Sequence, residues 1–327
     1  MWRPNRPAMV SCPCLAHAHL PQALSRVVVP GRPALGLQIC GLLLLPAAGW
    51  PRHRRFGSER GARIRAAATR EAVIDGSEVV IRRLTQEHEL DVELIQGLFQ
   101  PLELEELVAL CDARQGFQAS KQTLPSGEFI TDERRTSSSC PMLWPLMMPP
   151  EGLSQLPPAA RGGVEAELQA VLRVQRRCAE VIGVEEGRIE PLQLVRYLPD
   201  QYYRPHMDTH EEPHRMSSYA GEQRSHTMLV FLSDVPEDDG GGHLHFPKLG
   251  LKVLPQAGEA VLWQNLRDGQ PDPRALHEGV APTSCQKLVM NVWVADRPFS
   301  IAAIAAWGRR QKEMQPEPQP TTSQFLD

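Results

Sequence analysis

Hydrophobic and polar positions alternate over several short segments in the second half of the chain, which is the pattern of half-buried β-strands. Residues 192–198 alternate in this way, and residues 227–235, 251–255 and 258–263 have the composition of further strands. Residues 285–294 are almost continuously apolar and predict a buried strand. We therefore expect a β-rich core that begins near residue 187. A shorter β-rich stretch at 77–83 is expected to open the fold.

Two segments carry helical signals instead. Residues 101–111 begin with a proline, have early glutamates and space their Leu and Val residues as an apolar stripe. Residues 163–182 gather apolar side chains near one face. Arg173, Arg176 and Arg177 fall on the opposite face, which we expect to be solvated. Both helices are expected to support the β-rich core and not to form the site.

The beginning of the chain differs in composition from the rest. Residues 1–70 contain eleven arginines, no lysine and one acidic residue, although the whole chain has a net charge of −4. An apolar run at 34–50 has the length of a signal-peptide core, and the Arg-rich segment after it resembles a transit peptide. We therefore expect a targeting leader at 1–73, disordered or cleaved. A single domain over 74–300 and a C-terminal tail over 301–327 would follow.

This leader indicates that the protein is targeted to a cellular compartment but does not identify the compartment. We expect the secretory pathway, with the endoplasmic reticulum membrane or lumen as the site of residence. A plastid reached through a two-part leader is the alternative, and a disordered extension without an address is a third. Membrane contact is expected only through the leader, if it remains uncleaved. A basic leader on an acidic body is unlike a nucleic-acid-binding domain, whose basic surface belongs to the fold, so no nucleic-acid partner is expected.

Cysteine spacing excludes one class of metal site. Cys111, Cys140, Cys178 and Cys285 lie in the body of the chain with no C-x-x-C spacing, so neither a zinc site nor a redox dithiol is expected. The four could be free thiols, or they could form one or two disulfides in an oxidising compartment.

Candidate metal ligands stand at His206-x-Asp208. In an extended strand, residues i and i+2 point to the same face, so the two side chains can grip one metal ion from one side. His277 is the candidate third ligand. Two His and one carboxylate form the facial triad of non-haem Fe(II) oxygenases, which leaves metal positions open. His243 and His245 form a second i, i+2 pair and are the main rival ligands.

Lys287 stands at the beginning of the buried strand predicted over 285–294. Because burying a lone charge is costly, this cation needs an anionic partner. A dicarboxylate co-substrate, held by the metal through one end, would supply that anion at its other end.

Several further motifs accompany these residues in order. They are Arg135-Thr136-Ser137-Ser138, Gln193-Leu194-Val195-Arg196-Tyr197, Gln201-x-Tyr203-x-Pro205-His206-x-Asp208, Gly221-Glu222-Gln223-Arg224-Ser225-His226-Thr227, Gly241-Gly242-x-x-x-Phe246-Pro247, Leu276-His277-x-Gly279, Lys287 and Trp293. In these motifs the chain resembles the prolyl 4-hydroxylases, within the 2-oxoglutarate- and Fe(II)-dependent dioxygenases. The resemblance covers about residues 90–300. It departs at Leu244, Val280 and Leu288, where the family has Thr, Cys and Trp; these departures bear more on substrate preference than on iron binding.

The resemblance implies a mostly-β fold with flanking α-helices, namely a double-stranded β-helix, or jelly roll. It implies catalysis that uses Fe(II), 2-oxoglutarate and L-ascorbate. The implied iron ligands are His206, Asp208 and His277. The implied partner of the distal 2-oxoglutarate carboxylate is Lys287, with hydrogen bonds from the hydroxyls of Tyr197 and Thr227.

The resemblance also implies a substrate, a proline-containing peptide or protein hydroxylated at C4 of a peptidyl proline. Tyr203, Arg224 and Trp293 match family positions beside that substrate, although Tyr203 and Trp293 could also be ordinary core aromatics. A polar loop at 209–225 would close over the peptide. Two alternatives remain open: a 2-oxoglutarate/Fe(II) dioxygenase that acts on another residue or a small molecule, and a non-catalytic binding module.

Overall fold

The computed structural model describes residues 27–28, 69–86, 89–123, 129–148, 150–209, 223–302 and 304 of the 327-residue chain. Within these ranges, nine strands form one large antiparallel sheet. In spatial order its strands are β2 (Thr69–Ile74), β3 (Ser77–Arg83), β4 (Val92–Gln96), β14 (Ala260–Gln264), β11 (Arg224–Phe231), β18 (Lys287–Ala295), β9 (Gln193–Tyr197), β8 (Ser138–Pro141) and β5 (Gln118–Ala119).

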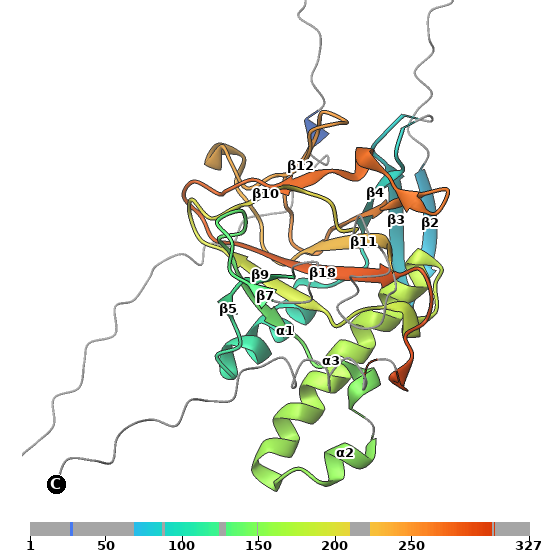
Figure 1. The fold of residues 1–327 in the computed structure, drawn as a ribbon, viewed down its shortest axis with the longest axis vertical. Helices are drawn as coiled ribbons and strands as arrows, with labels where there is room; N and C mark the ends of the chain where they lie inside the picture. The colour runs from blue at the N-terminus through green and yellow to red at the C-terminus, as the bar shows by residue number, and fades with distance from the viewer. Residues whose placement is uncertain are drawn as a thin grey trace, which may run out of the picture.

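A smaller sheet faces the central strands of the large one (Figure 1). Its described strands, in spatial order, are β1 (Val27–Val28), β13 (Leu251–Val253), β12 (Leu244–Phe246), β17 (His277–Gly279) and β10 (Tyr203–His206). Two short pairs complete the strands, namely β15 (Leu266–Arg267) with β16 (Gln270–Pro271) and β6 (Gln122–Thr123) with β7 (Phe129–Ile130).

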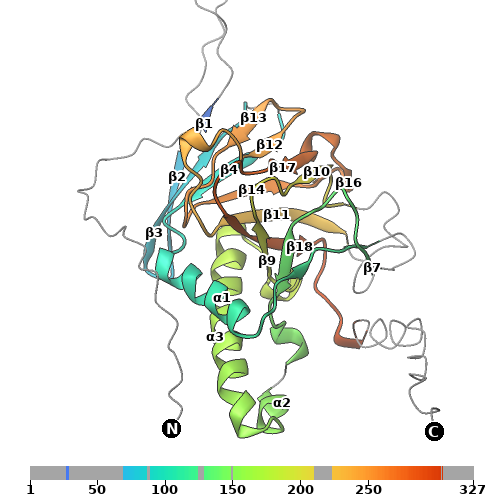
Figure 2. The same ribbon diagram turned by 90° about the vertical axis from the view of Figure 1, so that its left-hand side faces the viewer.

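The helices α1 (Pro101–Ala113) and α3 (Pro158–Ile182) cover the face of the large sheet that is turned away from the small one (Figure 2). Helix α2 (Pro150–Ser154) precedes α3, and α3 ends at Gly183, whose φ of 79° gives the left-handed conformation typical of a helix C-terminus. Single 3-10 turns occur at Pro145–Met147, Glu186–Arg188, Glu237–Asp239 and Pro273–Ala275. None of the described helices is both long and apolar enough to cross a bilayer.

Strand β18 shows how the two sides of the large sheet differ. Met290 and Val292 point into the core shared with the helices, whereas Val289 points into the core between the sheets. Because strand residues alternate between faces, Lys287 and Trp293 share the inner face with Val289. Other side chains of the core between the sheets are Leu229, Phe231, Phe246, Leu251 and Trp263.

This architecture confirms the predicted mostly-β fold with flanking helices, in the two-sheet arrangement of a jelly roll. The folded part reaches beyond the expected limits on both sides. Strand β2 begins at Thr69, because its whole length pairs with β3. Ile304 joins Trp144 and Phe299 in a small apolar cluster. Apart from β1 and those few residues, the predicted leader and tail lie outside the described residues.

The arginine face expected on α3 is only partly solvated. Arg177 has a side chain that is 14% exposed, and it forms ion pairs with Glu103 of α1 and Asp75 in the β2–β3 turn. Arg173 pairs with Glu106 of α1. The prediction of a solvated face was therefore wrong for Arg177, because α1 and the β2–β3 turn bring carboxylates from distant sequence to it.

Cys111 of α1 and Cys140 of β8 form a disulfide, which ties the helical layer to the large sheet. Cys178 is a buried free thiol and Cys285 is a half-buried one. The sequence left open whether these four cysteines are free or form one or two disulfides, and the structure contains one disulfide among them.

Candidate metal centre and active site

Two strands of the small sheet and the bend after one of them bring three candidate ligands together. His206 ends β10 and lies opposite His277, the first residue of β17. Asp208 lies two residues beyond His206, past the end of the strand, so its position is set by a bend and not by strand alternation as the sequence argument assumed. Its carboxylate oxygens lie 3.7 Å from Nε2 of His206 and 3.7 Å from Nε2 of His277.

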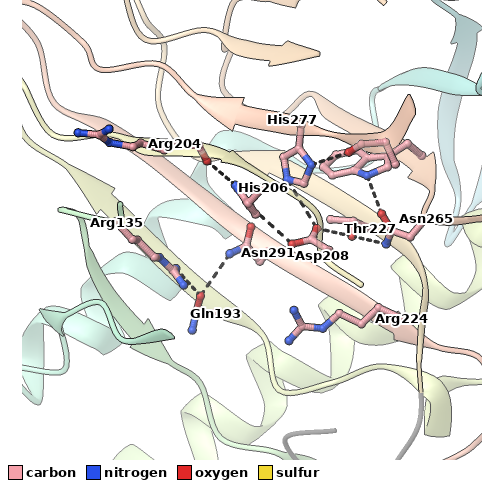
Figure 3. A network of polar contacts seen from close by, with 12 residues as sticks. Arg135, Gln193, Arg204, His206, Asp208, Arg224, Thr227, Asn265, His277 and Asn291 are labelled. Carbon is pink, nitrogen blue, oxygen red and sulfur yellow. Dashed lines mark hydrogen bonds and ion pairs between the residues drawn. The ribbon is translucent and has the colours of Figure 1, made fainter. Parts of the chain in front are cut away.

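Hydrogen bonds orient both imidazole rings for metal binding. Nδ1 of His206 lies 2.8 Å from the carbonyl oxygen of Arg204, and Nδ1 of His277 lies 2.9 Å from that of Ala275 (Figure 3). An Nδ1–H donated to a carbonyl leaves Nε2 as the free lone pair, which is how metal-binding histidines are usually fixed. Both Nε2 atoms therefore face Asp208 in the ligand form.

The ionisation states also suit a metal site. Burial and the neighbouring His277 lower the pKa of His206 to about 3. Burial alone would raise the pKa of Asp208, but His277, His206 and a hydrogen bond from Thr227 outweigh it and lower that pKa to about 2. At neutral pH the cluster thus offers the neutral imidazole of His206 and the carboxylate of Asp208.

This donor set fits a divalent iron ion. One ligand atom from each of the three residues lies within 4.8 Å of the others, and no other described group of three His, Cys, Asp or Glu side chains meets that test. Two imidazole nitrogens and one carboxylate match the Fe(II) facial triad. His245, one of the rival ligands, instead places Nδ1 2.6 Å from Glu278, and His243 joins no such group in the described residues.

A buried chain of hydrogen bonds supports Asp208. Trp263 Nε1 donates to Asn265 Oδ1 at 2.9 Å, Asn265 Nδ2 donates to Thr227 Oγ1 at 2.8 Å, and Thr227 donates to Asp208 Oδ2 at 2.7 Å (Figure 3). An indole can only donate, so the direction of every bond in the chain is fixed. The indole of Trp263 also packs edge-on against His277 at 4.8 Å.

This series of hydrogen bonds corrects the role expected for Thr227. The resemblance implied that its hydroxyl would bind 2-oxoglutarate, but the hydroxyl is fully buried between Asp208 and Asn265. Thr227 is a hydrogen-bond partner of the candidate ligand Asp208, and β14, which carries Asn265 just past its end, lies beside β11. Asn265 was not predicted as a site residue. The only feature of the sequence that pointed to it was its position as a polar residue after the apolar run of β14.

Lys287 is 1% exposed and begins β18 between the sheets. Its Nζ lies 3.5 Å from the carbonyl oxygen of His243 and 5.0 Å from the ring centroid of Tyr197. Among the described residues no carboxylate forms an ion pair with it, and burial lowers the pKa of its ammonium from 10.5 to about 7. An unpaired buried cation of this kind provides a site for an anion.

One cavity connects Lys287 with the three candidate ligands. Tyr197, Tyr203 and Trp293 contribute to its wall, and Leu229, Leu244 and Val289 make part of the wall apolar. A Cβ added at Gly279 would lie 3.2 Å from the hydroxyl oxygen of Tyr197, so a side chain there would crowd Tyr197. Burial raises the pKa of Tyr197 to about 12, which keeps its hydroxyl protonated as a donor.

The three residues expected beside the substrate occupy different places. The ring of Tyr203 stacks on His206 with 3.5 Å between centroids, and Trp293 lines the cavity. Arg224 lies behind Trp293, with its guanidinium carbon 3.7 Å from the indole centroid, and forms two 2.7 Å hydrogen bonds with Glu190. Arg224 does not line the cavity. Most of the loop expected to act as a lid, residues 210–222, lies outside the described residues.

A second polar chain beside the site was not predicted in full. Arg135 donates to Gln193 Oε1 at 2.8 Å, and Asn291 donates to the same oxygen at 3.2 Å (Figure 3). The guanidinium carbon of Arg135 lies 4.9 Å from the ring centroid of Tyr203. Asn291 lines the cavity, and its even spacing from Lys287 was the signal that could have identified it.

Comparison with known proteins agrees with this geometry. Residues 192–295 match the model of the 2OG-Fe(II) oxygenase superfamily. This segment is therefore similar to 2OG-Fe(II) oxygenase domains.

Within that superfamily, the similar curated proteins are prolyl 4-hydroxylases, so the resemblance stated from the sequence is confirmed. A putative prolyl 4-hydroxylase of Acanthamoeba polyphaga mimivirus is 37% identical over 116 residues, which are 34% of this chain and 47% of that protein. Prolyl 4-hydroxylase 1 of Arabidopsis thaliana is 32% identical over 151 residues, which are 42% of this chain and 52% of that protein. The chain thus spans about half the length of these relatives.

Among solved structures, the viral collagen prolyl hydroxylase of Paramecium Bursaria Chlorella virus-1 in its 2OG complex is 20% identical, with a TM-score of 0.44. The match covers 62% of this chain and 95% of that one.

Proposed function

We propose that this chain hydroxylates C4 of a peptidyl proline, consuming O₂ and 2-oxoglutarate and releasing succinate and CO₂. One observation carries the proposal: an unpaired, fully buried lysine and a His-Asp-His cluster line the same cavity between two sheets. A single dicarboxylate could chelate a metal at the cluster through one end and pair with the lysine through the other.

His206, Asp208 and His277 would hold Fe(II). With 2-oxoglutarate and O₂ bound, the iron supplies the oxidation that replaces a C–H bond of proline by C–OH while 2-oxoglutarate loses CO₂. The contribution of the chain is to position these partners and to exclude water. The carbonyls of Arg204 and Ala275 keep the imidazoles in the ligand tautomer.

Lys287 would pair with the distal carboxylate of 2-oxoglutarate, and the hydroxyl of Tyr197 would add a hydrogen bond. Binding the anion would satisfy a charge that is otherwise buried alone, so the co-substrate site is favoured by the cost of leaving it empty. Leu244 lines the same cavity and offers no hydroxyl, which leaves Tyr197 as the neutral donor of this site.

The substrate would lie against Tyr203 and Trp293. Extended proline-rich segments have little conformational entropy left to lose and dock on aromatic surfaces. Arg224 would act through Trp293, because its guanidinium covers one face of that indole. L-Ascorbate is proposed as the reductant that restores iron oxidised in turnovers without peptide.

An oxidising compartment is proposed for the protein, within the secretory pathway and at the endoplasmic reticulum. The Cys111–Cys140 disulfide supports it, because disulfides persist in such compartments and are rare in the cytosol. The test is a reporter fused to residues 1–68, which should enter the secretory pathway. A cytosolic reporter would reject this address, and a plastid reporter would favour the two-part leader.

Peptide turnover tests the proposed activity. Proline-rich, collagen-like and lysine-containing peptides are each incubated with the protein, Fe(II) and 2-oxoglutarate, and mass spectrometry locates any added oxygen. Oxygen at C4 of proline, with one succinate formed per oxygen added, is the expected result. Oxygen on lysine, or 2-oxoglutarate consumption stimulated only by small molecules, would reject the prolyl substrate and keep the dioxygenase chemistry.

A further inference from the structure

Strand β18 presents every second side chain to the cavity, and Lys287, Val289, Asn291 and Trp293 all line it. The proposed function uses the lysine at one end and the indole at the other. Asn291 lies between them and has no part in it. An amide group on a cavity wall that is shielded from water is costly unless its polar atoms are hydrogen-bonded.

The direction of the Asn291 amide is fixed by its neighbours. A guanidinium only donates hydrogen bonds, so the bond from Arg135 identifies the facing atom of Gln193 as its oxygen. Asn291, directly opposite Gln193 across β18 and β9, donates its amide nitrogen to that same oxygen. Its own oxygen therefore points the other way, toward the side of His206 and Asp208 (Figure 3).

Two polar atoms on this wall lack partners. The amide oxygen of Asn291 accepts no hydrogen bond from any described residue, and the buried Nε1 of Trp293 donates none. Arg224 and Glu190 hold the Trp293 ring in place from behind. The amide oxygen of Asn291 is thus the acceptor on this wall that the described residues leave open, whereas Nε1 of Trp293 is closed off from the cavity.

We propose that Asn291 selects the peptide: its amide oxygen accepts the backbone N–H of a residue next to the target proline. This inference rests on the proposed function. Proline has no backbone N–H, so a run of consecutive prolines cannot satisfy the amide oxygen of Asn291. The enzyme therefore prefers a proline flanked by a residue that carries an N–H.

Matched peptides test this inference. One peptide has glycine on both sides of a single proline, and two others carry N-methylglycine in place of one of the glycines. Each N-methyl group removes one N–H and leaves the remaining backbone in place. With the unaltered enzyme, methylation at one of the two positions should lower kcat/KM about tenfold relative to the unmethylated peptide. This is the loss expected when one hydrogen bond to a desolvated acceptor is removed.

Variants assign the effect to Asn291. Asn291→Leu is nearly isosteric and has no acceptor. For this variant, the ratio of kcat/KM between the unmethylated peptide and the poorly used N-methylated peptide should approach one. Gln193→Leu releases the amide of Asn291 and should also reduce the ratio. Gln193→Glu is the matched control, because it keeps an oxygen for Arg135 and Asn291 and should preserve the ratio.

The outcomes separate this inference from the proposed function. Hydroxylation of all three peptides with equal efficiency rejects the role of Asn291 alone. The same holds if Asn291→Leu keeps the discrimination and instead changes the dissociation constant of Fe(II), since Asn291 would then serve the metal. If no peptide acquires oxygen on proline, the proposed function fails and this inference fails with it.

Discussion

His206 and His277 lie directly opposite each other in the antiparallel pair of β10 and β17, with their ring centroids 4.3 Å apart. Strand pairing therefore sets the separation of these two candidate ligands, although they are distant in sequence. Asp208 completes the cluster from the bend that follows β10. The three candidate ligands depend on one pair of short strands in the small sheet.

Replacing His206 by Ala should abolish turnover and weaken Fe(II) binding, because only two protein ligands would remain. Metal titration of the purified protein gives the dissociation constant independently of activity. His243→Ala is the control, since His243 belongs to no three-residue ligand group in the described structure. If His243→Ala lost iron and His206→Ala kept it, the ligand assignment would be wrong.

Replacing Lys287 by Met should raise the dissociation constant of 2-oxoglutarate by on the order of a hundredfold or more, because the anion loses its buried partner. Fe(II) binding should persist, since Lys287 is not a ligand. In the absence of 2-oxoglutarate the variant should unfold at higher urea concentration, because a buried unpaired cation has been removed. Calorimetric titration and urea unfolding measure the two effects, and an unchanged 2-oxoglutarate affinity would contradict the assignment.

The low pKa of Lys287 predicts a specific pH dependence. Burial lowers this pKa from its ordinary value of 10.5 to about 7. Between these values the unfolded chain binds the proton and the folded one does not, so the contribution of Lys287 to the unfolding free energy rises with pH across this window and is lowest below pH 7. A bound anion favours the ammonium, so 2-oxoglutarate binding above pH 7 should take up a proton. Calorimetry in two buffers of different ionisation enthalpy detects that uptake, which Lys287→Met should lack.

The chain of hydrogen bonds to Asp208 predicts an effect on metal affinity. Thr227→Val keeps the shape of the side chain but leaves Asp208 without its donor, and partners of this kind typically contribute 10- to 100-fold to metal affinity. Thr227→Ser retains the hydroxyl and is the control. Asn265→Asp should act like Thr227→Val, because a second acceptor would compete for the threonine proton. Equal Fe(II) dissociation constants for Thr227→Val and Thr227→Ser would show that the hydroxyl is not needed.

Removing the disulfide should destabilise the fold. Cys111 and Cys140 are 29 residues apart in sequence, and closing a loop of that length contributes about 3–4 kcal/mol in the chain-entropy treatment. The double variant Cys111→Ala, Cys140→Ala should therefore unfold at lower urea concentration. Cys285→Ala, which removes a thiol outside any disulfide, is the control. Equal unfolding midpoints for the two proteins would argue against a stabilising disulfide.

The sequence by itself determined the fold class and the chemical identities at the site. Alternation along a strand is a local property, so the β-rich core and the buried position of Lys287 could be read from neighbouring residues. His206 and Asp208 are two residues apart and needed only local geometry to meet. His277 was a candidate for the third member, and the resemblance supported it.

Only the tertiary structure decided what each polar atom faces. Thr227 donates to Asp208 because β14 brings Asn265 beside it, and Arg224 lies behind Trp293 because Glu190 holds it there. A hydroxyl or amide can point in several directions, and the choice depends on donors and acceptors brought together from distant strands. Hydrogen-bond direction is thus a property of packing that spacing along the chain does not encode.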